Sequence, residues 1–256
     1  MKKRITIDGG AVVYVLEHPV RDRRDSEKVR AAKAKATSAA QQLRNQILSV
    51  RQLELLLACN FPTPGSGLVC CLPFDDQHMP GSRAQAQRKF KYFLKLLRQE
   101  RRAAGLPEPR VIYSPEVLTS SAGRWHYHIV IDSTGNDLDI IRRCWRYGSD
   151  VDASPLRVDE EKNHETQARY MSKELREAQE YNSRPGLHGW SCTRNCLRPE
   201  VDEQVVEDRK PLRAPRGATV LIQERRSTEF AEHALLKYRL PARCFQHRAR
   251  SRRRRR

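Results

Sequence analysis

The chain has 256 residues, and its 49 lysines and arginines exceed its 31 aspartates and glutamates, which gives a formal net charge of +18. An excess of this size favours a polyanionic partner such as nucleic acid. The sequence holds no long apolar run and no charged-then-apolar leader, so it predicts a soluble, cytoplasmic protein without a membrane partner. The 7 cysteines are scattered, as is typical of a reducing compartment.

The first 60 residues are predicted to form a basic arm followed by one helix. Residues 21–40 are rich in Arg, Lys and Ala, so they favour a solvated helix or an arm along nucleic acid. Apolar residues then recur at helical spacing, at Leu43, Ile47, Val50 and Leu57. The turn-forming segment 61–65 ends this pattern, which predicts that a core-packed helix stops there.

Residues 61–200 are predicted to hold the main domain, which begins with a strand and a helix. The apolar run 68–72 is closed by Pro73 and is too short for a helix, so it predicts a buried strand. Ser82 is positioned to cap a helix that runs to about Gly105. The apolar side chains of this helix share one face, at Phe90, Phe93, Leu94 and Leu97.

A β-hairpin and two further helices complete this domain. Two extended segments, 110–118 and 125–132, flank a polar turn and predict the hairpin. Helices are expected at about 137–147 and 165–181, with a short extended piece near 151–158 between them. This order of elements predicts an α+β fold with a mostly antiparallel central sheet flanked by helices.

The last part of the chain, residues 201–256, is predicted to be a C-terminal extension. Its hydrophobic pattern is weaker than that of the preceding domain and predicts a strand at 218–223 and a helix near 229–238. The arginine run 252–256 predicts a disordered basic tail, because such a segment has no apolar surface to bury.

Two histidines lie one residue apart in the second strand of the hairpin. Because side chains alternate along a strand, His126 and His128 share one face, while Tyr127 points to the other. Two neighbouring imidazoles form half of a metal site, although strand histidines are often only polar surface residues. Glu116 on the preceding strand joins their face if it pairs with either histidine, but not if it pairs with Tyr127. These three ligands would suit Mn²⁺ or Mg²⁺ acting on a phosphate.

A tyrosine on a later predicted helix supplies a nucleophile. The apolar stripe of that helix comprises Ala168, Met171, Leu175 and Ala178. Tyr170 and Lys173 share a face roughly opposite the stripe, which argues against Tyr170 as a buried core residue. A phenol is a poor nucleophile at neutral pH, since its ordinary pKa is about 10. A nearby metal or the Lys173 ammonium would favour the phenolate.

These segments stand in the order of three known motifs. Segments 68–74, 125–128 and 170–173 resemble, in order and approximate spacing, the motifs of HUH endonucleases. Within that superfamily, the chain resembles the rolling-circle replication initiators of small plasmids and single-stranded DNA phages. The resemblance covers about residues 40–200 and extends to the flanking segments 60–61 and 190–199.

The resemblance implies a metal-dependent, site-specific DNA endonuclease and strand transferase that nicks single-stranded DNA at a replication origin. Tyr170 would attack the phosphate and keep the 5′ end as a phosphotyrosine, and the free 3′ hydroxyl would prime synthesis. Glu116 matches the usual third ligand of the family, and Lys173 its motif lysine. The next tyrosine, Tyr181, is too far along for a two-tyrosine site. No Gly-rich phosphate loop is present, so unwinding would need a helicase of the bacterial host. A host polymerase is the other partner that the resemblance implies.

Three arginines are candidate phosphate contacts: Arg169, Arg194 and Arg198. For Arg194 and Arg198, a solvated loop is an equal alternative. Two other interpretations of the chain stay open. It could be a non-catalytic basic DNA-binding protein whose hairpin histidines have no role, or a relaxase or transposase that uses the same chemistry.

Overall fold

The computed structural model describes residues 2–20, 39–118, 124–159, 163–172, 189–207, 210–228 and 231–241. The fold is α+β and contains two antiparallel five-stranded sheets. The chain divides into two compact units: a terminal unit (Met1–Cys59, Asp159–Glu165 and Arg198–Arg256) and a central unit (Asn60–Val158 and Thr166–Leu197). The predictions made for the basic arm 21–38, for residues 173–181 and for the arginine tail lie outside the described residues.

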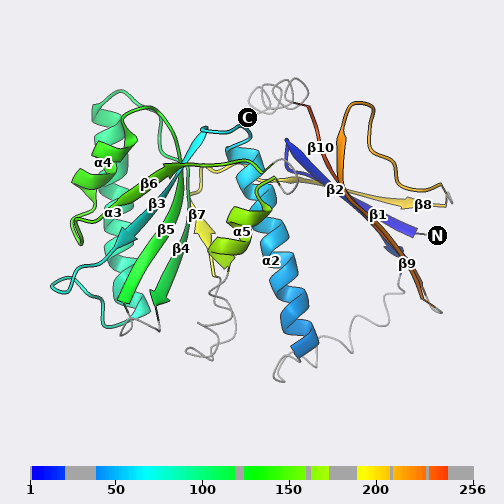
Figure 1. Ribbon diagram of the computed structural model, residues 1–256, viewed down its shortest axis with the longest axis horizontal. Coiled ribbons are helices and arrows are strands. Elements are labelled where there is room, and N and C mark those ends of the chain that lie inside the picture. Colours follow the sequence, from blue (N-terminus) through cyan, green and yellow to red (C-terminus); the bar gives the residue numbers. More distant parts are fainter. Residues whose placement is uncertain are drawn as a thin grey trace. The chain divides into compact units, whose positions relative to one another are not determined.

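The central unit is built on a sheet with the strand order β6-β3-β5-β4-β7. Its strands are β3 (Gly67–Pro73), β4 (Val111–Leu118), β5 (Arg124–Asp132), β6 (Asp152–Pro155) and β7 (Ser191–Cys192). Its helices are α3 (Arg83–Ala103), α4 (Asp137–Cys144) and, apart from its first residue, α5 (Glu165–Ser172). Helices α3 and α4 lie on one side of the sheet (Figure 1). The predicted strand at 68–72, the hairpin and the helix from Ser82 are confirmed.

Helix α3 begins and ends where its sequence signals lie. The Ser82 side chain accepts a hydrogen bond from the backbone N–H of Gln85 at 3.3 Å and so caps the first turn. Just after the helix, Gly105 adopts a positive φ of 67°, which a residue without a Cβ adopts at no steric cost. The predicted apolar stripe is buried, and its side chains are those of Phe90, Phe93, Leu94 and Leu97.

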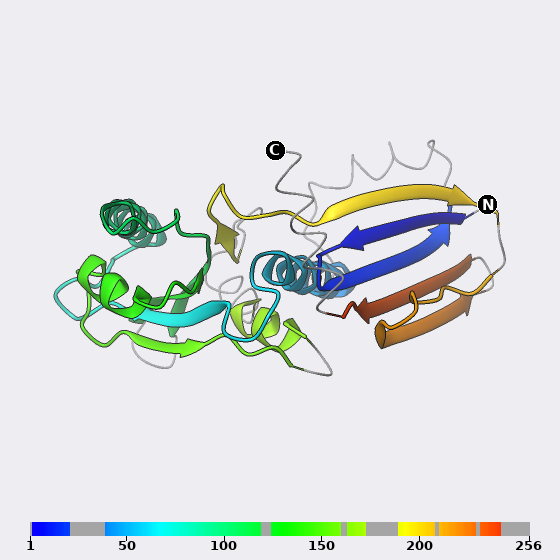
Figure 2. The ribbon, with the colours of Figure 1, turned by 90° about the horizontal axis from the view of Figure 1, so that it is seen from above.

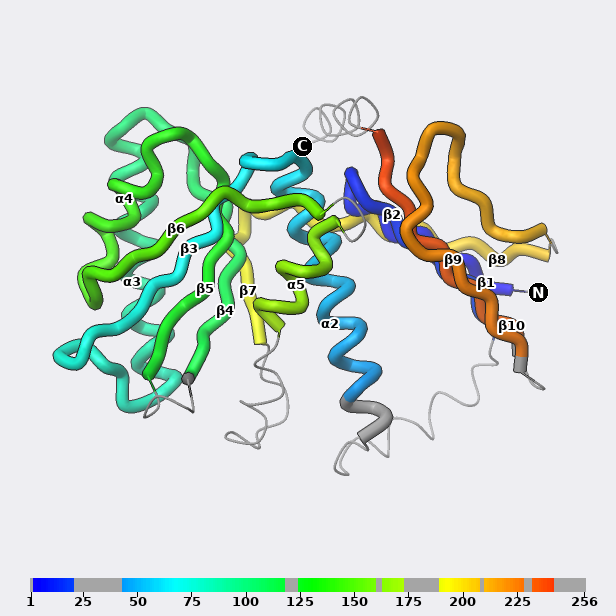
Figure 3. The backbone as a smooth tube through the Cα atoms, in the orientation of Figure 1, coloured from blue at the N-terminus to red at the C-terminus, as the bar shows by residue number. Residues whose placement is uncertain are grey.

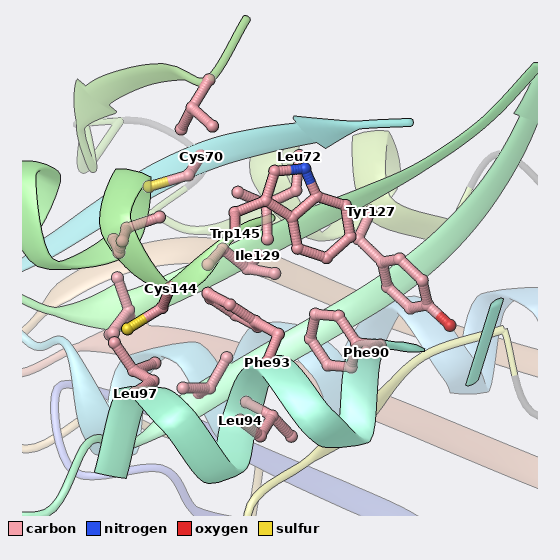
Figure 4. Packing of buried hydrophobic residues seen from close by; sticks show 14 of the residues in the cluster. Cys70, Leu72, Phe90, Phe93, Leu94, Leu97, Tyr127, Ile129, Cys144 and Trp145 are labelled. Atoms are coloured by element: carbon pink, nitrogen blue, oxygen red, sulfur yellow. The ribbon is translucent and has the colours of Figure 1, made fainter. Parts of the chain in front are cut away.

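The core of the central unit lies between α3, α4 and one face of the sheet. Figure 4 shows the stripe of α3 packed against side chains from strands β3 and β5. Phe90 stacks on Tyr127 with ring centroids 4.1 Å apart, and Leu72 and Ile129 are fully buried nearby. Burial of each large side chain here contributes about 1.5–3 kcal/mol. Because side chains alternate along β5, the packing of Tyr127 directs both neighbouring histidines to the opposite face.

A fully buried arginine joins α3 to the end of β5 and the start of α4. Arg101 donates hydrogen bonds to the carboxylates of Asp132 at 3.1 Å and Asp137 at 2.5 Å, and to the backbone oxygen of Asp132 at 2.6 Å. Asp137 also accepts from the hydroxyl of Thr134 at 2.7 Å and from the backbone N–H of Gly135 at 3.2 Å. The buried charges are therefore paired, as burial in a low-dielectric core requires.

The register of the β4–β5 hairpin is one that the sequence predicts. Glu116 pairs with His126, and Ser114 pairs with His128. On the other side of β5, Cys71 of β3 pairs with His128 and Leu72 pairs with Tyr127. The face turned away from α3 and α4 therefore carries Glu116 and both histidines, together with Cys71 and Ser114.

The terminal unit contains a second sheet, with the strand order β8-β1-β2-β10-β9. Its elements are β1 (Lys2–Asp8), β2 (Val12–Pro19), α2 (Ala39–Asn60, whose last residue belongs to the central unit), β8 (Glu200–Val206), β9 (Thr219–Thr228) and β10 (Ala231–Arg239). Strands from the two ends of the chain lie side by side in it (Figures 2 and 3). The predicted strand at 218–223 is confirmed as part of β9.

Two sequence-based expectations fail in the terminal unit. The predicted helix near 229–238 is wrong, because Ala231–Arg239 form strand β10, which hydrogen-bonds to both β2 and β9. The N-terminal extension is also not only helical, since β1 and β2 precede α2. Apolar residues of β2 and β10, among them Val13 and Leu236, are buried in one cluster. Pairing within a sheet thus overrides the local helix preference of the segment.

Helix α2 is confirmed, but only its second half is packed. Leu43 and Ile47, which the helical pattern places in the core, are 52% and 51% exposed, whereas the buried side chains begin at Val50 among those of this helix that the structure describes. Farther along, buried Glu54 accepts a hydrogen bond from the Tyr14 hydroxyl at 2.6 Å and pairs with Lys237 at 2.8 Å. No helix among the described residues is long and apolar enough to cross a membrane.

Candidate active site

The two histidines of β5 lie on the open face of the central sheet and approach each other closely. Their Nε2 atoms are 3.0 Å apart, and the rings meet edge to face with centroids 4.7 Å apart. Both residues are largely buried, His126 with 7% and His128 with 5% of its surface exposed. Each ring therefore directs one nitrogen at the same point, away from bulk water.

Glu116 supplies a carboxylate at that point. Its Oε2 lies 2.8 Å from Nε2 of His126 and makes a second, shorter contact with Nε2 of His128. The hairpin register is the cause, because pairing of Glu116 with His126 brings the carboxylate onto the histidine face. Three potential ligand atoms, two nitrogens and one oxygen, thus converge.

Tyr170 of α5 faces the same point. Its hydroxyl lies 3.4 Å from Nε2 of His128, and the two rings are 4.8 Å apart between centroids. Tyr170 is 44% exposed, whereas Ala168 and Met171 are 0% and 1% exposed, as the predicted stripe requires. Ser114 on β4 holds this helix in place, since its hydroxyl lies 3.0 Å from the backbone oxygen of Met171.

The charges of these groups influence one another. Burial disfavours the charged form of Glu116, but hydrogen bonds from His126 and His128 and their electrostatic effect outweigh it and lower the pKa of Glu116 from 4.5 to about 2. Burial and the negative charge of Glu116 raise the pKa of Tyr170 above its ordinary value of 10.0. The phenol therefore keeps its proton at neutral pH until a positive charge is placed beside it.

The lowered pKa of Glu116 predicts how stability depends on pH. The folded protein holds this carboxylate ionised more strongly than the unfolded chain does, so the stabilisation is present above about pH 4.5 and is lost as pH falls toward about 2. In metal-free protein, we expect Glu116→Gln to be less stable than wild type at pH 6, with the difference shrinking toward pH 3. Urea unfolding at several pH values measures this difference.

The control for this pH experiment is Glu100→Gln, because Glu100 is an exposed carboxylate of the same unit that pairs with Arg143 at a longer 3.5 Å. We expect this variant to follow wild type throughout. A difference between Glu116→Gln and wild type that stays constant from pH 6 to pH 3 would contradict the assignment of the linkage to Glu116.

Cys71 is a possible metal ligand that the sequence reasoning missed. The Cys71 Sγ and one ring nitrogen of each histidine all lie within 4.8 Å of one another. Burial, followed by the negative charges of Glu116 and Asp152, raises the pKa of the Cys71 thiol to about 11. Alternation along segment 68–72 already places Cys71 opposite to its buried neighbours. The sequence does not reveal that β3 lies beside the histidine strand.

The remaining predicted site residues are three arginines and one lysine. Arg169, next to Tyr170, and Arg194 after β7 are exposed in the central unit. Arg198 is exposed but belongs to the terminal unit. Lys173 lies outside the described residues. The structure thus brings together Glu116, both histidines and Tyr170.

We compared the chain with protein-family models, curated protein sequences and solved structures. No protein-family model, curated protein sequence or solved structure matches the chain significantly. The function is therefore argued from the residues of the site and the electrostatics around them.

Proposed function

We propose that this chain is an HUH-type endonuclease that nicks and rejoins single-stranded DNA at a replication origin as a rolling-circle initiator. The observation that carries the proposal is the convergence of His126, His128 and Glu116 on one point, with the Tyr170 hydroxyl 3.4 Å from His128. A purely structural histidine pair would not need a half-exposed tyrosine and a partly buried carboxylate at the same point. The antiparallel sheet, with the histidines on a strand between two others, supports the same assignment.

The three ligand atoms fit a divalent cation. Two imidazole nitrogens and one carboxylate oxygen form a mixed donor set of the kind that binds Mn²⁺ or Mg²⁺ at a phosphate. The two Nε2 atoms and the carboxylate oxygen are electron-rich and lie close together. A proton or a cation bound between them would offset their mutual repulsion. When bound, the cation would act as a Lewis acid on the scissile phosphate and offset negative charge in the transition state.

Tyr170 is the nucleophile in this proposal. Its Oη forms a bond to the phosphorus, and the bond from phosphorus to the 3′ oxygen breaks, with its electron pair leaving on that oxygen. The phenol loses its proton and the 3′ oxygen gains one, so the products are a 5′ phosphotyrosine and a free 3′ hydroxyl. The energy of the phosphodiester is kept in the phosphotyrosine, and attack by a 3′ hydroxyl reverses the reaction and rejoins a strand.

The surroundings of Tyr170 suit a phosphate-bearing strand. Tyr170 is 44% exposed, and Arg169 and Arg194 are exposed cations of the same unit that we assign to phosphate contacts. The net charge of +18 would draw DNA to the protein. The free 3′ end would be extended by a host polymerase behind a host helicase.

A covalent adduct tests the proposal directly. The full-length protein is incubated with Mn²⁺ and single-stranded oligonucleotides of randomised sequence and is then separated under denaturing conditions. We expect a protein–DNA adduct that needs Mn²⁺ and carries DNA through its 5′ end. Sequencing of the attached DNA should give one preferred cleavage site. Binding of the oligonucleotides without any adduct would contradict the proposal and favour a non-catalytic DNA-binding protein.

A further inference from the structure

Cys71 stands where a fourth metal ligand would stand. It pairs with His128 across the β3–β5 ladder, so its thiol is on the histidine face while Cys70 and Leu72 point into the core. Its Sγ and the two histidine nitrogens all lie within 4.8 Å of one another. The negative charge of Glu116 contributes to the raised pKa of Cys71, and Cys71 contributes to the raised pKa of Tyr170.

A thiolate changes which metal the site prefers. Carboxylate and imidazole side chains bind Mn²⁺ and, less readily, Mg²⁺. Sulfur ligands instead favour softer ions such as Zn²⁺. Zinc sites with four protein ligands are usually tetrahedral and closed, and catalytic sites keep one position for water or substrate. With zinc bonds of about 2.0–2.3 Å, the atoms of a tetrahedral ligand set lie roughly 3.3–3.7 Å from one another. The two Nε2 atoms, 3.0 Å apart, and the Glu116 oxygen must therefore separate slightly and the Cys71 Sγ must settle within this range, which side-chain rotation can supply.

We propose that Cys71 acts as a fourth, metal-selecting ligand, so that Zn²⁺ is held by Cys71, His126, His128 and Glu116 in a closed and inactive site. This inference rests on the metal site of the proposed function and adds a regulation to it. Manganese or magnesium leaves the Cys71 thiol protonated and one position open for the phosphate. Binding of zinc replaces the S–H bond by a sulfur–metal bond and releases the proton to the solvent.

Cobalt(II) makes the sulfur bond visible without any measurement of activity. We expect Co²⁺ added to the metal-free, reduced, full-length protein to produce a thiolate-to-cobalt charge-transfer band in the near ultraviolet, together with intense visible bands of tetrahedral cobalt. Cys71→Ser should lose the charge-transfer band. Cys192→Ser is the matched control and should keep it, since Cys192 is a half-buried cysteine on β7 rather than on β3. A band that survives in Cys71→Ser would overturn the inference.

The double variant His126→Ala/His128→Ala separates this inference from the proposed function. If the wild type binds no more cobalt than the double variant does, the metal site itself is wrong and both proposals fail. If cobalt binding depends on the histidines but shows no thiolate band, Cys71 is not a ligand and the three-ligand metal site stands.

Zinc inhibition supplies a second measurement. With cleavage supported by Mn²⁺, we expect added Zn²⁺ to inhibit the wild type, and the concentration for half inhibition to rise at least about tenfold in Cys71→Ser relative to that variant's own uninhibited rate. Cys192→Ser should be inhibited like the wild type. Equal zinc sensitivity of Cys71→Ser and wild type, or cleavage by the wild type with zinc as fast as with manganese, would overturn the inference.

Discussion

Tyr170→Phe is expected to lower the rate of strand cleavage at least about 10³-fold and to abolish the covalent protein–DNA adduct, because it removes the nucleophilic oxygen. The ring itself remains, so its edge-to-face contact with His128 is kept. The variant should therefore fold normally and bind single-stranded DNA with the affinity of the wild type. Quantification of the adduct in the presence of Mn²⁺, beside filter binding of the same oligonucleotide, measures both properties.

Tyr92→Phe is the matched control for this experiment. Tyr92 lies on α3 of the same unit and is 43% exposed, close to the 44% of Tyr170, but α3 packs on the opposite face of the sheet. We expect Tyr92→Phe to form the adduct at the wild-type rate. An adduct that persists in Tyr170→Phe would show that another residue attacks the phosphate and would remove Tyr170 from the mechanism.

Arg101→Ala is expected to reduce the free energy of unfolding of the central unit by about 3–5 kcal/mol. The substitution removes the arginine that pairs with Asp137, whose side chain is 0% exposed, and leaves Asp132, whose side chain is 11% exposed, with the more distant Arg110 at 3.8 Å. An uncompensated buried charge costs far more than the hydrogen bonds alone contribute. The loss should also loosen the start of α4, because Asp137 links Arg101 to the turn before that helix.

Tryptophan fluorescence during urea unfolding measures this effect in the relevant part of the molecule. All 3 tryptophans, Trp125, Trp145 and Trp190, belong to the central unit. The neighbouring Arg102→Ala is the control, since Arg102 is exposed, and it should change stability by no more than about 0.5 kcal/mol. A similarly small change in Arg101→Ala would mean that the buried ion pairs contribute nothing to folding.

The central unit could be predicted because its signals are local. Ser82 and Gly105 mark the ends of α3, and the apolar stripe between them is buried as its spacing predicts. The hairpin follows from two extended segments around one turn, which limits the possible registers to a few. The observed pairing of Glu116 with His126 is among those that place all three ligands on one face.

Features that depend on distant segments could not be predicted in this way. The residues of β10 have the composition of a helix, and their partner β2 lies at the other end of the chain. Arg101 continues the helical spacing of the stripe of α3, but its burial depends on Asp132 at the end of β5 and Asp137 at the start of α4, which lie 31 and 36 residues farther along the chain. Cys71 joins the site only because β3 pairs with β5.

The described residues include four of the predicted catalytic and metal-binding residues but not Lys173. The geometry of His126, His128, Glu116 and Tyr170 agrees with the sequence-based hypothesis, and the variants above test their chemistry. Lys173 lies outside the described residues, so its role in stabilising the phenolate stays a prediction. A pH profile of adduct formation by Lys173→Gln would show whether its ammonium lowers the pKa of the nucleophile.

The sheet that joins the two ends of the chain determines when the protein can finish folding during its synthesis. Strand β2 is made before the central unit, but β10, which covers one edge of β2, is made only after it. At about 5–20 residues per second, that edge and its apolar side chains wait roughly ten to forty seconds for their partner. The central unit can be complete before then. An unpaired apolar edge promotes association between chains, so the nascent terminal unit is the part of this protein that most needs a chaperone.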